Sequence, residues 1–278
     1  MSSFLHKNVL ITGAASGIGR LLADKVLKAG ADNLVIWDID TENLSRAVDR
    51  LTETGASVHA YVVDLTDLDQ IVTAGKLVLD EVGPIDMLFN NAGLVTGGKY
   101  IDNTHRQIDR VIRVNVLGVM QTTRVFLPAM VERDSGHIVN ISSAASLIAN
   151  RNMTVYVGSK WAVTGWSESL RLEMESSGSG VRITTVQPGY IGTGMFEGVT
   201  APLLTPLLDP DAITDAIIRA VKRNKILLRK PFIVKLIPFL KGVMPTRLFD
   251  LVAGKLFKVY ESMDSFRGRS QYVQEADE

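Results

Sequence analysis

Tyr156 and Lys160 are four residues apart in the segment "VYVGSKW". On an α-helix, side chains at positions i and i+4 project from one face, so we expect the phenol and the ammonium to share one small volume. A free phenol has a pKa of about 10 and is a poor base at neutral pH. At about 4 Å and an effective dielectric constant of about 20, an ammonium offers about 4 kcal/mol, enough to lower the phenol pKa by roughly two to three units. The pair therefore predicts a proton-transfer centre, although two polar residues also fall at this spacing by chance.

The segment after the first candidate strand is rich in glycine. The strand Asn8–Thr12 runs directly into "GAASGIG", which opens a candidate helix. Glycines allow a tight turn and a close approach of backbone N–H groups to a pyrophosphate, and the start of a helix adds partial positive charge. The spacing Gly-x-x-x-Gly-x-Gly differs from the Gly-x-Gly-x-x-Gly fingerprint of dinucleotide-binding turns, so the two agree in what the glycines can do but not in their spacing. An ordinary glycine turn is the alternative. The residues expected to face the cofactor are Gly13, Ser16, Gly17, Ile18 and Gly19.

Asp38 ends the second candidate strand, Asn33–Asp38, nineteen residues beyond Gly19. A carboxylate at this point can accept hydrogen bonds from both ribose hydroxyls of NAD. The same carboxylate would repel the 2′-phosphate of NADP, and the electrostatic cost would be on the order of several kcal/mol. No Lys or Arg offsets that charge at the nearby positions, which are Ala14, Ala15, Ser16 and Ile39. The sequence therefore predicts NAD over NADP, unless Asp38 only caps the following turn.

Polar and small residues also follow three further candidate strands, Ser57–Val63, Ile85–Asn90 and Gly136–Ile141. Ligands of parallel sheets bind at the carboxyl ends of the strands, so these residues are expected to border a ligand. Asp64 is a candidate partner of the adenine amino group, and small residues let the backbone lie against a ribose. The set comprises Asp64, Leu65, Asn91, Ala92, Gly93, Ser142 and Ser143, and several of these residues are also common in turns.

Asn115 interrupts the apolar stripe of the candidate helix Thr104–Arg133. A core-facing amide needs partners, because an unsatisfied one costs about 1 to 3 kcal/mol. Two interpretations remain open from the stripe alone. Asn115 is either a structural bracket or the anchor of a water molecule near the site.

Short runs rich in β-branched residues alternate with longer segments of helical period, which is typical of βαβ units. The sixth candidate strand is Val181–Gln187. Helices are expected at Gly17–Ala29, Glu42–Glu53, Leu68–Val82, Thr104–Arg133, Thr154–Ser176 and Pro210–Lys222. The pattern predicts an α/β fold, a single Rossmann-like, doubly wound parallel sheet of about seven strands flanked by helices.

The alternation breaks after Pro188, and we predict two parts. Residues 1–225 form a catalytic domain that includes a substrate loop, 190–210. The apolar side chains of this loop suggest that it is a lid over a hydrophobic pocket. Residues 226–278 form an apolar and basic C-terminal extension. Residues 219–258 hold eleven Lys or Arg and one acid, Asp250. Segment 226–258 is therefore expected to contact an anionic membrane or to pack on its own domain with its lysines reaching into water.

The composition excludes several classes of protein. The chain has no cysteine and its four histidines are scattered, so neither a disulfide nor a metal site is expected. We find no signal sequence or membrane-spanning run, which predicts a soluble, cytoplasmic protein with at most peripheral membrane contact. Nucleic acid binding is not expected, because the interleaved residues are mostly aliphatic and prolines interrupt the basic face.

The order of these features resembles the motifs of the short-chain dehydrogenase/reductase superfamily over roughly residues 5–225. The matching motifs are Thr12-Gly13-x-x-x-Gly17-Ile18-Gly19, Asp64, Asn90-Asn91-Ala92-Gly93, Asn115, Ser143, Tyr156-x-x-x-Lys160 and Pro188-Gly189. The resemblance implies that Tyr156 is the general acid/base, that Lys160 lowers its pKa and holds the nicotinamide ribose, and that Ser143 orients the substrate oxygen. It further implies that Asn115 holds a water in a proton relay, and that Ile191 and Thr193 fix the carboxamide after the Pro188-Gly189 turn.

The segment "NLVIWDID" and the apolar tail are most similar to the branch that holds retinol dehydrogenases and lipid-associated 17β-hydroxysteroid dehydrogenases. This resemblance implies an NAD(H)-dependent oxidoreductase of lipid metabolism that interconverts an alcohol and a carbonyl on a steroid, retinoid or long-chain alcohol. It also implies a homodimer or homotetramer. One alternative is an NADPH-dependent 3-ketoacyl (acyl carrier protein) reductase whose basic tail docks the acidic carrier. The other is a non-catalytic dinucleotide-binding scaffold.

Overall fold

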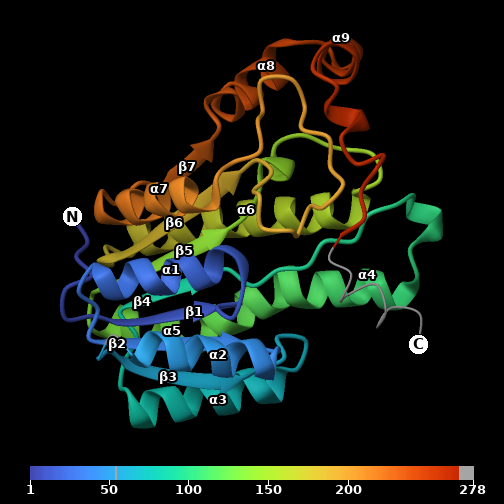
Figure 1. Cartoon of the computed structure of the whole chain (residues 1–278). Coiled ribbons are helices and arrows are strands. Elements are labelled where there is room, and N and C mark those ends of the chain that lie inside the picture. The colour runs from blue at the N-terminus through green and yellow to red at the C-terminus, as the bar shows by residue number, and fades with distance from the viewer. Residues whose placement is uncertain (54, 269–278) are drawn as a thin grey trace.

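The computed structural model of the chain describes residues 1–53 and 55–268, so the last part of the predicted extension, 269–278, lies outside the described residues. In the described part of the chain, seven parallel strands form one sheet in the order β3-β2-β1-β4-β5-β6-β7 (Figure 1). Their bounds are β1 (Asn8–Thr12), β2 (Asn33–Asp38), β3 (Ser57–Val62), β4 (Met87–Asn90), β5 (Gly136–Ile141), β6 (Val181–Pro188) and β7 (Leu227–Lys230). The predicted fold class is confirmed.

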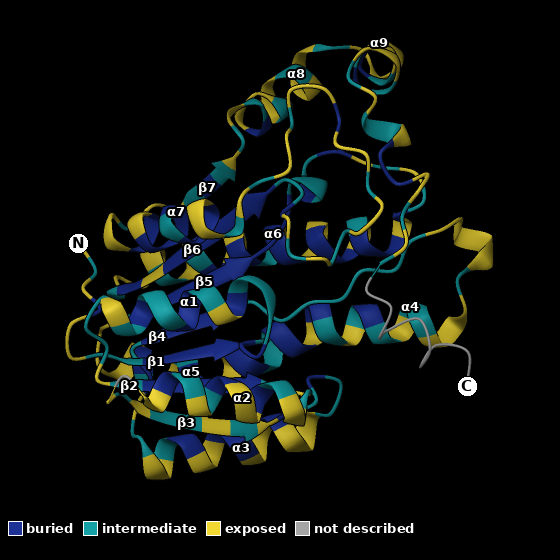
Figure 2. Ribbon diagram, viewed as in Figure 1, coloured by how far each residue is buried: buried dark blue, intermediate teal, exposed yellow. Residues whose placement is uncertain are grey.

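Helices cover both faces of the sheet. Their bounds are α1 (Gly17–Lys28), α2 (Thr41–Thr52), α3 (Leu68–Glu81), α4 (His105–Ile112), α5 (Val119–Glu132), α6 (Thr154–Ser176), α7 (Pro210–Lys222), α8 (Ile237–Val243) and α9 (Thr246–Leu251). Side chains alternate along each strand, so Val9 and Ile11 pack with α1, α2 and α7, whereas Leu10 packs with α3, α5 and α6 on the other face. A parallel sheet covered on both faces explains why most of its strands are almost continuously apolar and buried (Figure 2).

The predicted helix Thr104–Arg133 differs from the expectation in its middle. Thr104 caps the helix start through a capping box with Gln107, but residues Arg113–Gly118 form a π-helical segment between α4 and α5. Gly118 is needed there, because a Cβ atom would come within 2.9 Å of the Leu65 Cβ. By length and composition His105–Glu132 could span a membrane, but half of the window is buried, as in a core helix. A π-helical turn places side chains where a regular helix would not, which matters for the site.

The chain reverses direction across the sheet between β3 and β4. After β3, at one edge, the chain returns to place β4 on the other side of β1. Strands on either side of this point connect to helices on opposite faces, which opens a crevice at their carboxyl ends. The ends of β1, β2, β4 and β5 all meet this crevice, so the strand-end residues can converge there.

The last part of the described chain lies beyond β6. Strand β7 pairs with β6 through Thr185–Pro188, so the residues that follow 226 begin inside the same sheet. The loop after β6 and helices α8 and α9 rise together at the top of the view, over α6 (Figure 1). These segments carry much more exposed surface than the sheet below them (Figure 2). They enclose a second, smaller hydrophobic cluster around Ile148, Phe249 and Ala253.

Candidate functional site

The turn between β1 and α1 requires glycine. Gly13 has φ +66°, and a Cβ atom on it would lie 2.8 Å from the Ala92 Cα. A Cβ atom on Gly19 would overlap the Gly13 carbonyl oxygen and the Asn91 amide. Both positions therefore demand a residue without a side chain, and the turn keeps its backbone close to the end of β4.

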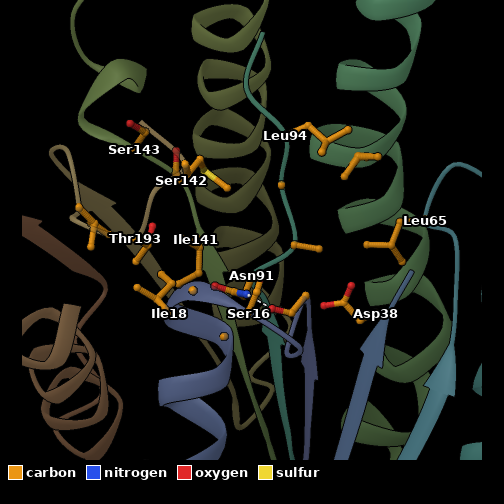
Figure 3. A pocket seen from close by; sticks show the side chains of 18 of the residues that line it. Ser16, Ile18, Asp38, Leu65, Asn91, Leu94, Ile141, Ser142, Ser143 and Thr193 are labelled. Carbon is orange, nitrogen blue, oxygen red and sulfur yellow. Dashed lines mark hydrogen bonds between the residues drawn. The ribbon is translucent and has the colours of Figure 1, made fainter. Parts of the chain in front are cut away.

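Asp38 lies beside this turn at the end of β2. Its Oδ2 accepts from the Ala15 N–H at 2.9 Å and its Oδ1 from the Asp40 N–H at 3.1 Å. Burial raises the pKa of Asp38, and these backbone hydrogen bonds oppose the rise. Figure 3 shows Asp38 and Leu65 on one side of the turn, Ile141, Ser142, Ser143 and Thr193 on the other, and Ser16 and Asn91 between them. A carboxylate fixed by backbone donors is a suitable acceptor for a ribose hydroxyl.

Asn91 and Asn115 hold the segment after β4. The Asn91 Nδ2 donates to the Thr12 and Gly13 carbonyls at 2.9 and 3.0 Å, which joins the ends of β4 and β1. The Asn115 Oδ1 accepts from the Leu94 N–H at 2.7 Å, and its Nδ2 donates to the Leu94 carbonyl and the Ser159 Oγ, each at 2.9 Å. Asn115 is fully buried and does not line the cleft. The structure thus favours the bracket over the water anchor for its side chain.

Tyr156 and Lys160 project from α6 into one cleft, and both are buried. The Lys160 Nζ lies 5.6 Å from the centroid of the Tyr156 ring and donates to the Ile141 carbonyl at 2.9 Å. Burial lowers the pKa of Lys160 to about 8. Burial raises the pKa of Tyr156, and a hydrogen bond with Ser143 opposes that rise. Desolvation of the phenol thus outweighs the lowering of its pKa that the spacing of the pair predicts.

The cleft brings together every predicted catalytic and cofactor residue except Asn115. Those that line it are Gly13, Ser16, Gly17, Ile18, Gly19, Asp38, Asp64, Leu65, Asn91, Ala92, Gly93, Ser143, Tyr156, Lys160, Pro188, Gly189, Ile191 and Thr193. Ser142, expected from the sequence to border a ligand, also lines the cleft, and further lining residues that were not singled out include Trp37, Leu94, Arg110, Val114, Ile141, Met195 and Phe196. Two of these positions could have been predicted from the sequence, because Leu94 directly follows the Asn-Asn-Ala-Gly segment and Phe196 lies in the apolar loop. Arg110 could not have been predicted, because α4 reaches the cleft only in the folded chain.

A second cavity adjoins the cleft and is lined mostly by apolar side chains. We call it the apolar pocket. Its walls come from the segment after β5, the loop after β6, and residues 233–259, and it shares Ser143, Gly189 and Phe196 with the cleft. The Phe196 ring packs edge-on against Tyr156 at 5.9 Å and against Tyr190 at 5.1 Å between centroids. A hydrophobic molecule in the pocket can therefore contact Ser143 directly, and it lies near Tyr156 through the shared Phe196.

Among the described residues, no group of three or more His, Asp or Glu is arranged to hold a metal ion. The polar groups that converge on the cleft are instead backbone amides, hydroxyls, side-chain amides, the carboxylates of Asp38 and Asp64, the Lys160 ammonium and the Arg110 guanidinium. This set matches the donors and acceptors of a dinucleotide and an alcohol.

Comparison with known proteins supports this arrangement. A model of the short chain dehydrogenase family matches residues 7–203. Epidermal retinol dehydrogenase 2 of Homo sapiens is 38% identical over 262 residues, which cover 93% of this chain and 84% of the relative. Estradiol 17-beta-dehydrogenase 11 of Rattus norvegicus is 32% identical over 262 residues, covering 94% and 87%. A crystal structure of a short chain dehydrogenase/reductase from Burkholderia phymatum in complex with NAD has a TM-score of 0.77 at 27% identity, covering 91% of this chain and 96% of that one. Complexes with NADP also occur among similar solved structures.

Proposed function

Because this chain belongs to the short-chain dehydrogenase family, we propose that it is an NAD-dependent oxidoreductase that interconverts an alcohol and a carbonyl group on a hydrophobic substrate. The observation that carries this proposal is the apolar pocket beside the cleft, which shares Ser143 and Phe196 with it, Phe196 packing edge-on against Tyr156. A pocket of this composition favours a steroid, a retinoid or a long-chain alcohol over a small polar one.

The cleft fits NAD by the shape of its backbone. The missing side chains of Gly13 and Gly19 leave room that a Cβ atom would fill, at the start of α1, where a pyrophosphate is best placed. Asp38 would accept the ribose hydroxyls, and its charge disfavours a 2′-phosphate. Bound NAD⁺ would supply the hydride acceptor for the alcohol, and its positive charge would favour the phenolate form of Tyr156.

Three side chains of the chain manage the proton. The Tyr156 Oη takes it from the alcohol or returns it to the carbonyl oxygen. Ser143, whose Oγ accepts from the Ala145 N–H at 3.1 Å, orients the substrate oxygen beside the phenol. Lys160 holds the nicotinamide ribose, and its ammonium gives the buried phenol a nearby positive charge. Asn115 keeps Leu94 in place behind them.

A substrate screen tests this function. Purified protein is mixed with NAD or NADP and a panel of steroids, retinoids and fatty alcohols, and NADH or NADPH absorbance is followed. We expect turnover of hydrophobic alcohols with NAD and much slower turnover with NADP. A strong preference for NADPH with ketoacyl substrates would favour the 3-ketoacyl reductase. Binding of NADH without conversion of any compound would favour the non-catalytic scaffold.

We further propose that the protein contacts an anionic membrane through α8, α9 and the residues around them. The inner side of this region, including Leu240 and Phe249, lines the apolar pocket. Its outer side is also apolar, with Phe232, Phe239 and Val243 exposed by 68%, 67% and 61%. Since only one of the two apolar sides of these helices is covered, the other side favours contact with a further apolar partner. The excess of cations in residues 219–258 indicates that this partner is an anionic lipid surface.

Vesicle flotation tests the membrane contact. The triple variant Phe232→Ser, Phe239→Ser, Val243→Ser is compared with a matched triple variant on α3, at the opposite end of the molecule, in which Leu68, Val72 and Leu77 become Ser. Wild type and the α3 variant should float with vesicles that contain phosphatidylserine, and the first variant should not. Equal flotation of all three proteins would remove this proposal.

A homodimer or homotetramer is also proposed, built from the helices that begin near Thr104 and Thr154. Their outer faces expose apolar side chains, including Val131, Trp161 and Leu172. Light scattering should give two or four times the chain mass of 30.4 kDa. A mass of one chain at micromolar concentration would contradict it.

A further inference from the structure

Three polar side chains form a cluster in the wall of the apolar pocket. Asn150 precedes α6, Tyr190 follows β6, and Ser262 follows the short helical turn Val259–Glu261. The Asn150 Nδ2 lies 3.2 Å from the Tyr190 Oη and 2.8 Å from the Ser262 Oγ. The two hydroxyls are 2.8 Å apart, and Ser262 donates to the Val259 carbonyl at 2.8 Å. The cluster joins three distant parts of the chain, and Ser262 is only 1% exposed.

The hydrogen atoms of this cluster can be assigned by counting. The Ser262 hydrogen is used for the Val259 carbonyl, so Tyr190 must donate to Ser262. The two Asn150 amide hydrogens then serve Tyr190 and Ser262. Each of the four contacts has one hydrogen. With the Asn150 amide reversed, only the two hydroxyl hydrogens would remain for the same four contacts, which excludes that orientation.

All the polar hydrogens of the three side chains are therefore used within the cluster, but one hydrogen-bond acceptor remains unpaired. The Asn150 Oδ1 is buried, and within residues 1–53 and 55–268 it has no hydrogen-bond partner. Buried amide oxygens in proteins are almost always paired, so this atom calls for a donor. Asn150 itself lines the apolar pocket, whose other walls are mostly aliphatic and aromatic. Because the atom is almost fully covered, a donor carried by a molecule in the pocket can satisfy it when the Asn150 side chain shifts toward that molecule.

The cluster also lies close to the reaction centre. Phe196 packs edge-on against both Tyr156 and Tyr190, so a single aromatic side chain separates the catalytic phenol from the cluster. A molecule whose reacting carbon lies at Ser143 and Tyr156 would thus reach Asn150 with a group a few carbon atoms away.

We propose that Asn150 binds a second hydroxyl group of the substrate, positioned by Tyr190 and Ser262. The preferred substrate is then a hydrophobic diol or hydroxyketone rather than a simple alcohol. This inference rests on the proposed function, since it takes Ser143 and Tyr156 as the reacting end. It reverses the expectation for a purely apolar pocket, in which the second hydroxyl would lose its water without gaining a partner and would weaken binding.

A set of matched alcohols tests the proposal. Binding of 1-decanol and of 1,4-, 1,6- and 1,8-decanediol is measured by calorimetry on the full chain saturated with NADH, in which alcohols bind without being oxidised. We expect at least one diol to bind wild type about tenfold more tightly than 1-decanol. Asn150→Leu should abolish this advantage while leaving the affinity for 1-decanol unchanged or higher. The same alcohols are then assayed for turnover with NAD.

Thr205→Val is the matched control. Thr205 also lines the pocket, but its hydroxyl already donates to the Pro202 carbonyl at 2.9 Å, so this variant should keep the full diol advantage. The proposal fails if every diol binds wild type no better than 1-decanol, a result that does not depend on how the variants fold, or if the advantage survives in Asn150→Leu.

The binding and turnover assays separate the two proposals. Oxidation of 1-decanol without any diol advantage would leave the proposed function standing and overturn the role of Asn150. A diol advantage in binding that is lost in Asn150→Leu, without turnover of any alcohol, would support the hydroxyl subsite and overturn the proposed function.

Discussion

The cleft and the apolar pocket are built in opposite ways. The cleft takes its polar groups from strand ends and from the first turns of helices, where a buried sheet fixes their positions. The pocket takes most of its walls from the loop after β6 and from α8, α9 and their neighbours, with a smaller part from the segment after β5. In the proposed function, the redox chemistry therefore belongs to the sheet, whereas the choice of substrate belongs mainly to segments attached to its edge.

The largest effect is expected at the Tyr156 phenol, which lines the cleft and packs against Phe196 at the boundary with the pocket. Tyr156→Phe should lower kcat by about a thousandfold, because general acid/base catalysis contributes roughly 10² to 10⁴ in rate. NADH affinity, measured by fluorescence titration, should change little, since the ring remains in place. A variant that keeps more than a tenth of the activity would show that the cleft moves its proton by another group.

A smaller effect is expected at the nucleotide end of the cleft. Asp38→Asn keeps the shape of the side chain and removes the charge, so the preference for NAD over NADP, as a ratio of kcat/KM, should fall by about 100-fold. Asp64→Asn serves as the control, because Asp64 lines the same cleft and should leave the ratio nearly unchanged. If both variants shift the ratio equally, the preference arises from the general charge of the cleft rather than from Asp38.

The smallest effect is expected at the boundary between the two regions. Phe196→Ala removes an apolar wall and two edge-on ring contacts, so KM for a long-chain alcohol should rise about tenfold. KM for NAD should stay the same. The neighbouring Met195→Ala, which touches the cleft but not the apolar pocket, should leave KM for the alcohol unchanged. An equal rise of KM for NAD in Phe196→Ala would erase the distinction between cleft and pocket.

The sequence predicted the cleft better than the pocket, for a physical reason. Three strands, β1, β2 and β5, and helices α6 and α7 begin and end where the periodicity places them. Residues such as Asp38 and Ser143 are tied to those strand ends, so predicting the strand also places the side chain. The predicted division of the chain at residue 225 remains a prediction, as do the individual roles of the site residues.

Contacts between distant segments could not be predicted from the sequence. Nothing in the spacing of Tyr156 and Lys160 indicates that the ammonium would be held by the Ile141 carbonyl. The hydrogen bonds between Asn150 and Ser262 join residues more than a hundred positions apart. Periodicity also missed the π-helical segment, because a single inserted turn barely disturbs the apolar stripe of the helix around it.

Trp161 gives the molecule an optical probe of its own. The Lys241 ammonium of α8 lies 4.1 Å from the centre of the Trp161 ring, on the helix that carries Tyr156, and Trp161 is 43% exposed. Indole emission responds to a nearby cation and to water, so a displacement of α8 from α6 would change the intensity and the colour of this fluorescence. Any displacement of α8 when a molecule enters the pocket would therefore be detectable in a stopped-flow instrument without attaching a dye.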